Sequence, residues 1–571
     1  MCNNHLFNLR KSFMITFGFF LFSFSVLSQT AGWINAYGYG GTGDDKAYAL
    51  TVDKNGNFYI VGEYMSQSMT LGTSVLTNAN KTSTNLFVTK VDASGNVIWA
   101  KGFGEFGKDD AKCVTTDATG NVYIGGSFNS DSISFDGGTT YLKNSCQGCG
   151  WEDLFFAKFS STGSLIWAKK AGGADWEYAK GIAVDNNNNV YVTGNFTSDT
   201  IYFDSLMISD TNNTSEIFLA KYNSAGKLIW VKNYGKSLFN ESNGVVCDNS
   251  GNIYITGTFE ELSLNLGTQN LLNNGNNDVF LIKFGSAGNV LWAKNAGSSH
   301  AEYGKAITMD AAGNVYITGE FASDDITFGA YQILNKAQAA NTIDIYVAKF
   351  SPDGTAQYAK SFGGVGDEYV SAIAIDGNNN AYVIGSFSGS KLEADTRYLW
   401  NSNSNVGEIY MIKLSDAGAI SFAVRATGNL DDDGRSVVIW QGTPYGTGYF
   451  KSMDMKFSWL PIARKGLYDF FFGKIGLVAS VDNILDLNEH FKVYPNPSTD
   501  GLFRLESDQM ITGNLNIKVY DVMGKEVFNR IFTPDGSSDL SFTLGDSRSG
   551  IYQLYISGDD GQKISTKLII Q

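Results

Sequence analysis

The stretch Asp310-Ala-Ala-Gly-Asn-Val-Tyr-Ile-Thr-Gly319 decides the fold, because close copies of it recur through most of the chain. Six copies place an Asp before a turn of Gly or Asn, and a strand with a central tyrosine follows. The tyrosines are Tyr59, Tyr123, Tyr191, Tyr254, Tyr316, Tyr382 and, in a degraded copy, Tyr445. Successive tyrosines are 62 to 68 residues apart, which suits one four-stranded sheet with its loops. The chain is therefore predicted to be an array of sheets.

The third copy illustrates the strands of one repeat. Residues 178–185 and 190–196 alternate apolar with small or polar side chains around an Asn-rich turn, which is typical of a β-hairpin. Residues 216–222 and 227–232 repeat that pattern around a second turn. Asp at the turn start accepts backbone hydrogen bonds, and Gly or Asn tolerates the positive φ that such turns need. Each repeat is predicted to hold four strands.

Only one connection varies in length between the copies. The distance from the third-strand lysine to the fourth-strand aromatic residue is always nine residues, as from Lys90 to Trp99, whereas the stretch from the repeat tyrosine to that lysine varies between 29 and 35 residues. The variation lies between the second and third strands, so these connections are expected to gather on one face and to carry binding residues. The richest are residues 130–152 and 323–343.

The seventh copy lacks a fourth strand. It has strand patterns at residues 435–440, 445–450 and 469–474. The unmatched segment Gly32-Trp33-Ile34-Asn35-Ala36, which precedes the first copy, is expected to supply the missing strand and to hide two sheet edges. The prediction is an all-β fold with a seven-bladed β-propeller over residues 29–476, in which the N-terminal strand closes blade seven.

The two ends of the chain differ from the array. Residues 1–28 place Arg10 and Lys11 before an apolar run from 13 to 27, which is the layout of a secretory signal peptide. No later stretch reaches the roughly 20 apolar residues of a transmembrane helix, so the mature chain is expected to be exported and soluble. The net charge of −15 argues against nucleic acid as a partner, because phosphate contacts need clustered Lys and Arg.

Cysteine and histidine offer little chemistry. Cys146 and Cys149 form a single CxxC, for which a small disulfide is favoured in an exported chain over the alternative of a redox pair. The three histidines, His5, His300 and His490, form no cluster for a metal, and no nucleophile arrangement surrounds them. No catalytic residue is predicted.

A repeated carboxylate is the one constellation that suggests a ligand site. It stands eight residues before the end of the first strand, at Asp45, Asp109, Glu177, Asn240 with Glu241 beside it, Glu302, Glu368 and Asp432. Since first strands line the channel of a propeller, these groups are expected to circle one channel mouth and to hold a cation or a basic ligand. The alternative is that each carboxylate caps a Gly-rich turn or pairs with a blade lysine. Calcium at the Asp/Asn turns is a weaker alternative, because each turn has one carboxylate and calcium takes six to eight oxygens; no other cofactor is expected.

Residues 491–571 break the period. Short alternating segments separated by turns predict a small immunoglobulin-like β-sandwich there, after a linker at residues 477–490. Its distinctive residues are Tyr494-Pro495-Asn496-Pro497, Gly501, Val519-Tyr-Asp521, Gly524-Lys525, Gly550-Ile-Tyr552 and Lys567-Leu-Ile-Ile570.

Two resemblances follow from these motifs. The array resembles the SBBP family of β-propeller repeats, through the copies of residues 313–319 and through the Asp-x-Phe-x-x-Lys-Phe pattern of residues 278–284. That resemblance implies a fold and no single activity. The tail resembles the type A sorting domain of the type IX secretion system. It implies passage of a Gram-negative outer membrane, recognition of the tail by the translocon, and removal of the tail by a surface peptidase in the linker.

Three functions remain open at this stage. The leading hypothesis is a secreted or surface-bound, non-catalytic binding or adhesion protein whose variable connections contact a glycan or a protein. The second is a glycan-processing enzyme that uses the acidic channel mouth with a metal. The third is a structural component of a surface assembly.

Overall fold

The computed structural model describes residues 29–479 and 491–570, apart from residues 81, 210–213, 236–237, 268, 338–341, 402, 459, 495, 500, 508–514, 533–538, 545–547 and 559–562. The predicted signal peptide and most of the predicted linker lie outside these residues. The chain divides into two compact units, Ala31–Leu477 and Val478–Gln571. Within the described residues every regular element is a β-strand.

The repeat unit contains seven antiparallel sheets, each built around four strands in the order first-second-third-fourth. Six of them are β2 (Asp45–Val52), β3 (Phe58–Tyr64), β6 (Asn85–Val91), β7 (Val97–Phe103); β8 (Asp109–Thr116), β9 (Val122–Phe128), β12 (Asp153–Phe159), β13 (Leu165–Gly172); β14 (Glu177–Val184), β15 (Val190–Phe196), β18 (Glu216–Tyr222), β19 (Leu228–Tyr234); β20 (Asn240–Cys247), β21 (Ile253–Phe259), β24 (Asp278–Phe284), β25 (Val290–Ala296); β26 (Glu302–Met309), β27 (Val315–Phe321), β30 (Asp344–Phe350), β31 (Ala356–Gly364); and β32 (Glu368–Ile375), β33 (Ala381–Phe387), β36 (Glu408–Leu414), β37 (Ile420–Thr427). The third predicted repeat matches these strands to within two residues at each end.

The seventh sheet has the order β38-β39-β42-β1, with β38 (Asp432–Trp440), β39 (Thr443–Phe450), β42 (Asp469–Ala479) and β1 (Gln29–Tyr39). The N-terminal segment therefore pairs with β42, as the sequence predicted. β1 is longer than the predicted residues 32–36. Trp33 is fully buried against Phe457 at 4.8 Å between ring centroids, and its Nε1 donates to the carbonyl of Arg425 at 3.1 Å.

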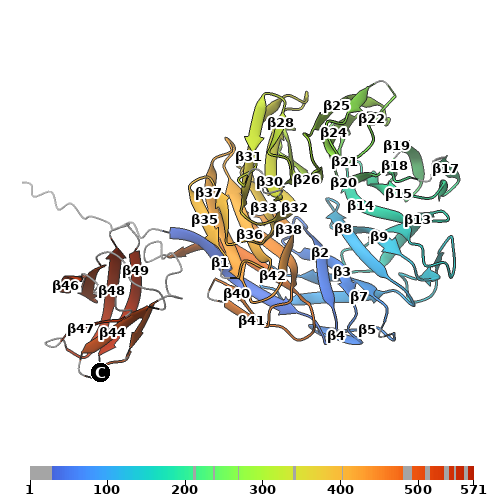
Figure 1. The fold of residues 1–571 in the computed structure, drawn as a ribbon. Coiled ribbons are helices and arrows are strands. Elements are labelled where there is room, and N and C mark those ends of the chain that lie inside the picture. Colours follow the sequence, from blue (N-terminus) through green and yellow to red (C-terminus); the bar gives the residue numbers. More distant parts are fainter. Residues whose placement is uncertain are drawn as a thin grey trace, which may run out of the picture. The chain divides into compact units, whose positions relative to one another are not determined.

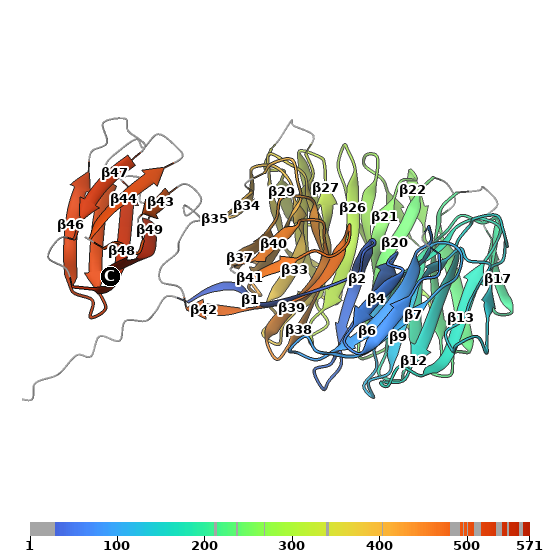
Figure 2. The same ribbon diagram turned by 90° about the horizontal axis from the view of Figure 1, so that it is seen from below.

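The first strands of the seven sheets lie innermost. Each contacts the first strand of the next sheet in chain order, and β38 of the seventh sheet contacts β2 of the first. In Figure 1 the labels β2, β8, β14, β20, β26, β32 and β38 surround one central point. In the view turned by 90° the strands of the array run between two opposite faces (Figure 2).

Neighbouring sheets are joined by a repeated contact of tyrosine, lysine and tryptophan. In the first repeat, Lys90 Nζ lies 5.2 Å from the centroid of the Tyr59 ring and donates to the carbonyl of Ser161 in the next sheet at 3.1 Å. Trp99 Nε1 donates to the same carbonyl at 3.2 Å. The same pair of donors recurs at Ser286 and at Pro352. The recurring lysines therefore have a structural role, because their ammonium groups are held over an aromatic ring and hydrogen-bonded.

A two-stranded hairpin, which the sequence pattern did not predict, occupies each variable connection. The hairpins are β4 (Ser68–Leu71) and β5 (Ser74–Thr77); β10 (Ser132–Ile133) and β11 (Leu142–Lys143); β16 (Thr200–Phe203) and β17 (Leu206–Ser209); β22 (Ser263–Asn265) and β23 (Asn270–Leu272); β28 (Asp325–Phe328) and β29 (Tyr331–Leu334); β34 (Lys391–Ala394) and β35 (Arg397–Trp400); and β40 (Asp454–Phe457) and β41 (Leu460–Ala463). β16, β34 and β40 pair with the fourth strand of the preceding sheet. Much of each variable connection is therefore regular structure on the outer side of the sheets.

The second unit has two antiparallel sheets that share one core. One sheet has the order β43-β44-β47, with β43 (Phe491–Tyr494), β44 (Leu502–Ser507) and β47 (Asp539–Thr543). The other has the order β46-β45-β48-β49, with β45 (Leu515–Asp521), β46 (Glu526–Phe532), β48 (Gly550–Gly558) and β49 (Lys563–Ile570). Phe503, Ile517, Phe542 and Leu554 are among the buried side chains that fill the space between them.

Candidate functional site

The predicted acidic ring is buried. Asp45, Asp109, Glu177, Glu302 and Glu368 expose none of their surface, and Asp432 exposes 2%. The prediction that these groups circle an open channel mouth is therefore wrong, because solvent or a ligand does not reach them. The alternative, a cap on a Gly-rich turn, describes their contacts.

Glu177 illustrates the cap. Its Oε2 accepts a hydrogen bond from the backbone N–H of Gly173 at 3.0 Å, and its Oε1 accepts one from the hydroxyl of Ser198, 21 residues later. The equivalent turn N–H and the hydroxyl of the serine 21 residues later donate to three other members of the ring, Asp45, Asp109 and Glu302. Asp432 instead accepts from the backbone N–H groups of Lys451 and Ser452 and from the Ser452 hydroxyl. The first four of these carboxylates thus each tie two connections together at a sheet boundary.

A second buried acid lies near several of these caps. Near Glu177 this acid is Asp153. Gly172, which ends the preceding fourth strand, packs on it, because a Cβ on Gly172 would lie 2.1 Å from Asp153 Oδ1. Burial, more than the neighbouring Asp153 charge, raises the pKa of Glu177 to about 8. Burial also raises the pKa of Asp344 to about 7 and that of Glu368 well above its usual value. Burial at the sheet boundaries therefore disfavours the ionised form of these carboxyl groups.

Glu241 differs from the rest of the ring because it is the second residue of its strand. Its carboxylate accepts a hydrogen bond from Lys180 Nζ and one from Asn243 Nδ2 at 3.0 Å. These contacts lower the pKa of Glu241 in spite of its burial. Glu241 lies among the side chains that face the neighbouring first strands.

Those side chains are the second and fourth residues of each first strand, where the burial pattern alternates. They are Lys46, Tyr48, Asp110, Lys112, Tyr178, Lys180, Glu241, Asn243, Tyr303, Lys305, Tyr369, Ser371, Asp433 and Arg435. Lys112 pairs with Asp110 at 3.2 Å and lies 3.5 Å from the centroid of the Tyr48 ring. Arg435 pairs with Asp433 at 3.1 Å. Each acid of this set is therefore paired with a neighbouring cation, as Glu241 is with Lys180.

The aspartates of the repeated turns bind their own turns. Asp53 Oδ1 accepts the backbone N–H groups of Asn55 and Asn57 at 2.9 and 3.0 Å, and its Oδ2 accepts from Tyr59 at 3.1 Å. These bonds lower the pKa of Asp53 against the opposing effect of burial. The same set recurs around Asp117, whose pKa falls to about 2. Among the described residues no group of three or more His, Cys, Asp or Glu is arranged to hold a metal ion.

Apolar side chains are exposed on the connections at one end of the sheets. They are Phe106, Trp176, Leu238, Phe239 and Val365, which precede first strands, and Leu467, which precedes β42, with exposed fractions from 39% to 77%. We call these six the apolar loop residues. The connections that carry them meet at the sheet boundaries, where the first residue of each first strand donates to the carbonyl before the third strand of the neighbouring sheet, as Glu177 does to Glu152 at 2.7 Å.

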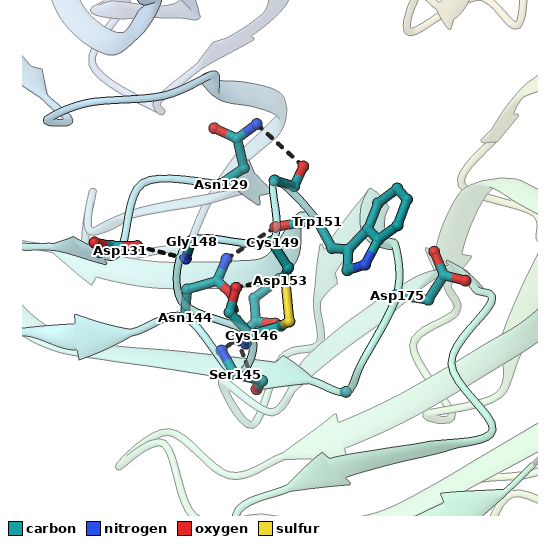
Figure 3. Close-up of a disulfide and its surroundings, with 12 residues drawn as sticks. Asn129, Asp131, Asn144, Ser145, Cys146, Gly148, Cys149, Trp151, Asp153 and Asp175 are labelled. Atoms are coloured by element: carbon teal, nitrogen blue, oxygen red, sulfur yellow. Dashed lines mark hydrogen bonds between the residues drawn. A yellow bond between two sulfur atoms is a disulfide. The ribbon is translucent and has the colours of Figure 1, made fainter.

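The CxxC loop lies beside two of these connections. Cys146 and Cys149 are joined by a disulfide, and Asn144 Nδ2 donates to the carbonyls of Phe128 and Trp151 at 3.1 and 3.0 Å. Figure 3 shows the Trp151 indole projecting away from the disulfide, toward Asp175. Cys113 and Cys247 are unpaired.

The sorting motif of the tail joins the start of this unit to its last strand. Asn496 Nδ2 donates to the carbonyl of Lys567 at 2.7 Å, and the N–H of Ile569 donates to Asn496 Oδ1 at 2.9 Å. Tyr552 is buried, with its hydroxyl on the carbonyl of Arg548. Gly501 has a φ of 71°, which requires glycine. Pro497 follows Asn496 and Gly550 begins β48, whereas Pro495 lies outside the described residues.

Family comparisons match both units. Residues 492–571 match the model of the secretion system C-terminal sorting domain, and residues 166–199 match that of the β-propeller repeat. The second unit is a type IX sorting domain. It directs export through the type IX system to the cell surface or beyond. The described residues include no helix that is long and apolar enough to span a membrane.

Individual relatives add little beyond the fold. An uncharacterized WD repeat-containing protein of Acanthamoeba polyphaga mimivirus is 23% identical over 60% of this chain and 29% of its own length. The regulatory protein FlaEY of Caulobacter vibrioides is 26% identical over 19% of this chain and 12% of its own length. The chain thus spans less than a third of the length of these two curated relatives.

Two solved structures are similar at low identity. The extracellular domain of a hybrid two-component system from B. thetaiotaomicron is 10% identical, with a TM-score of 0.14 over 93% of this chain and 98% of that one. Dimeric latent PorU from Porphyromonas gingivalis is 8% identical, with a TM-score of 0.13 over 69% of this chain and 32% of that one.

Proposed function

We propose that the chain is a type IX-exported, closed seven-bladed β-propeller that acts by non-catalytic binding or adhesion through the face that carries the apolar loop residues. Closure is supported by one repeated hydrogen bond. The first residue of each first strand donates across a sheet boundary, and the series includes Asp45 N–H to the carbonyl of Tyr468 at 3.0 Å, between the first and seventh sheets. The tail, in this proposal an immunoglobulin-like sandwich, engages the translocon.

One observation supports the binding role. Exposed apolar side chains lie at positions where the residue type differs from one repeat to the next. The equivalent connections carry Phe106, Trp176, Leu238 with Phe239, and Val365, while the repeated Tyr, Lys, Trp and Asp are engaged in the scaffold. Exposed apolar residues that recur on equivalent connections of an exported protein favour an interaction surface.

A binding role is also favoured over hydrolysis by the state of the acids. Six of the seven ring carboxylates are buried caps, and Glu241 is bound to Lys180. Paired carboxylates for glycoside hydrolysis need access to a sugar ring. No cofactor enters this proposal, and the partner is a surface glycan or protein.

The test compares two variants of the mature chain with four substitutions each. The face variant carries Phe106→Ser, Leu238→Ser, Val365→Ser and Leu467→Ser. The rim variant carries Ile98→Ser, Ile229→Ser, Leu291→Ser and Trp400→Ser, which are also exposed but lie on fourth strands and an outer hairpin. Binding is measured by flow cytometry of labelled protein on intact Gram-negative cells and on a microbial glycan array.

We expect the face variant to lose binding and the rim variant to keep it. Both variants should melt within a few degrees of the wild type, because the replaced side chains are exposed. Absence of wild-type binding to cells and array, or equal loss in both variants, would contradict the proposal.

A further inference from the structure

Two tryptophans from different sheets meet on the proposed binding face. The rings of Trp151, which precedes β12, and Trp176, which precedes β14, have centroids 4.3 Å apart and planes at 78°. Trp176 remains 39% exposed. Edge-to-face packing leaves the faces of at least one indole available to a ligand while it holds both rings in place.

Trp151 is held by a loop with several internal hydrogen bonds. Asn144 Nδ2 donates to the Trp151 carbonyl, Cys146 N–H donates to Asn144 Oδ1 at 2.8 Å, and Gly148 N–H donates to Asp131 Oδ1 at 2.9 Å. The disulfide between Cys146 and Cys149 closes this loop (Figure 3). A loop fixed in this way loses little conformational entropy when a ligand binds.

Trp176 is fixed from the neighbouring sheet. The backbone N–H of Trp176 donates to Thr197 Oγ1 at 3.1 Å and to Asp175 Oδ1 at 3.0 Å. The backbone carbonyl of Trp176 accepts from the N–H of Thr197 at 2.9 Å. The adjacent residues Glu152 and Glu177 share the boundary hydrogen bond. Both indoles are therefore preorganised by backbone contacts that do not involve their rings.

A hydrogen-bond acceptor lies beside the pair. Asp175, toward which the Trp151 indole projects in Figure 3, uses one carboxylate oxygen on the backbone N–H of Trp176 and has a second oxygen. Two cations that contact the two residues after Trp151 in the chain are already paired, Lys108 with Glu152 at 3.2 Å and Lys170 with Asp153. An indole face beside a carboxylate acceptor suits a pyranose, whose C–H face packs on the ring and whose hydroxyls donate to oxygen.

The size of the patch also favours a sugar over a protein. A stable protein interface buries about 800 Å² on each partner, which two partly buried indoles do not supply. We propose that Trp151 and Trp176 form a subsite for one or two pyranose units of a neutral glycan, with Trp176 as the stacking residue and Asp175 as an acceptor. This inference rests on the proposed function, because it names the ligand class of the same face.

The experiment titrates the full mature chain with neutral hexasaccharides of glucose, mannose, galactose and N-acetylglucosamine at up to millimolar concentration. Calorimetry and intrinsic tryptophan fluorescence report binding. Trp176→Ala is compared with Trp176→Phe, which keeps a stacking ring, and with Trp400→Ala, which removes an exposed tryptophan from an outer hairpin. Circular dichroism confirms that each variant is folded.

We expect at least one hexasaccharide to bind, Trp176→Ala to weaken it about tenfold or more, and Trp176→Phe to restore most of the affinity. Trp400→Ala should match the wild type. Equal affinity in Trp176→Ala and the wild type, binding of oligolysine in place of the sugars, or no binding of any hexasaccharide would overturn the subsite. If one of these three results is found while intact cells still bind the wild type but not the face variant, the subsite is refuted and the proposed function stands.

Discussion

At the scale of single residues, the repeated side chains of this protein hold neighbouring sheets together. The tyrosine donates to the turn aspartate, the lysine lies over the tyrosine ring, and the lysine and tryptophan share one carbonyl of the next sheet. The carboxylates that begin the first strands do the same at the other end of the sheets. These contacts explain why the repeated residue types carry information about fold and none about a ligand.

The glycine at or just after the end of each fourth strand is required by close packing. In Gly297→Ala the added Cβ would lie 1.9 Å from Asp278 Oδ1, so the variant should lose about 1–3 kcal/mol of unfolding free energy. Gly377→Ala is the control, because nothing lies within 4 Å of its Cβ position. Urea denaturation of both variants measures the difference, and equal stability of the two would contradict the packing argument.

The buried carboxyl groups predict an unusual pH dependence. Folding raises the pKa of Glu177 to about 8, of Asp344 to about 7 and of Asp109 to about 6, in each case mainly by burial. The folded chain therefore binds more protons than the unfolded chain. The stability from these groups is fully present below about pH 4 and is lost as the pH rises through 6 to 8.

Thermal melts between pH 5 and pH 9 test this dependence. The melting temperature should fall on the alkaline side, and Glu177→Gln should flatten the fall because it removes one titrating group. Glu105→Gln, which changes an exposed carboxylate, should leave the slope unchanged. A melting temperature that rises from pH 6 to pH 9 would refute the assignment.

At the scale of elements, the four main strands of each repeat could be predicted from the sequence, whereas the outer hairpins could not. The four strands of each repeat followed from period-two alternation and from turn residues, and they lie where expected, as for residues 190–196 and β15. The hairpins were hidden because their strands are only two to four residues long, too short for an alternation signal to stand out.

A signal for the hairpins does exist. Ten and twelve residues after each repeat tyrosine stand two buried apolar side chains: Met69 and Leu71, Ile133 and Phe135, Ile201 and Phe203, Leu264 and Leu266, Ile326 and Phe328, Leu392 and Ala394, Met455 and Phe457. The burial of the acidic ring was less accessible to sequence reasoning. Its serine partners stand about 21 residues away, in a connection of irregular composition.

The hairpins are predicted to stabilise the boundaries between sheets. Phe203 is fully buried and Tyr202, its neighbour in β16, is 57% exposed. Phe203→Ala should therefore cost about 3–5 kcal/mol, whereas Tyr202→Ala should stay within about 0.5 kcal/mol. Chemical denaturation distinguishes them, and a small effect of Phe203→Ala would mean that the hairpin is an appendage and not part of the core.

At the scale of the whole molecule, the N-terminal strand and the tail have different roles. β1 completes the sheet of β42, and Tyr39 donates its hydroxyl to the carbonyl of Gly95 in the first sheet. A mature chain that begins at residue 40 should melt at a lower temperature and aggregate through the exposed edge of β42. A synthetic peptide of residues 29–39 should restore the melting temperature. Unchanged melting of the truncated chain would show that β1 is dispensable.

The tail is predicted to act in export and not in binding. A chain without residues 492–571, expressed with its signal peptide in a bacterium that has the type IX system, should accumulate in the periplasm. The full chain should reach the surface or the medium, and immunoblots of cell fractions measure both. Export of the truncated chain would contradict the role of the sorting domain.

Carbene footprinting of the full mature chain on intact Gram-negative cells tests the central claim most directly, because it maps the bound face even when the ligand is unidentified. We expect protection of Phe106, Trp176, Val365 and Leu467 on cell binding. Ile98, Ile229 and Trp400, which are also exposed, should label equally in the free and bound protein. Protection of the outer strands with unchanged labelling of the apolar loop residues would contradict the claim.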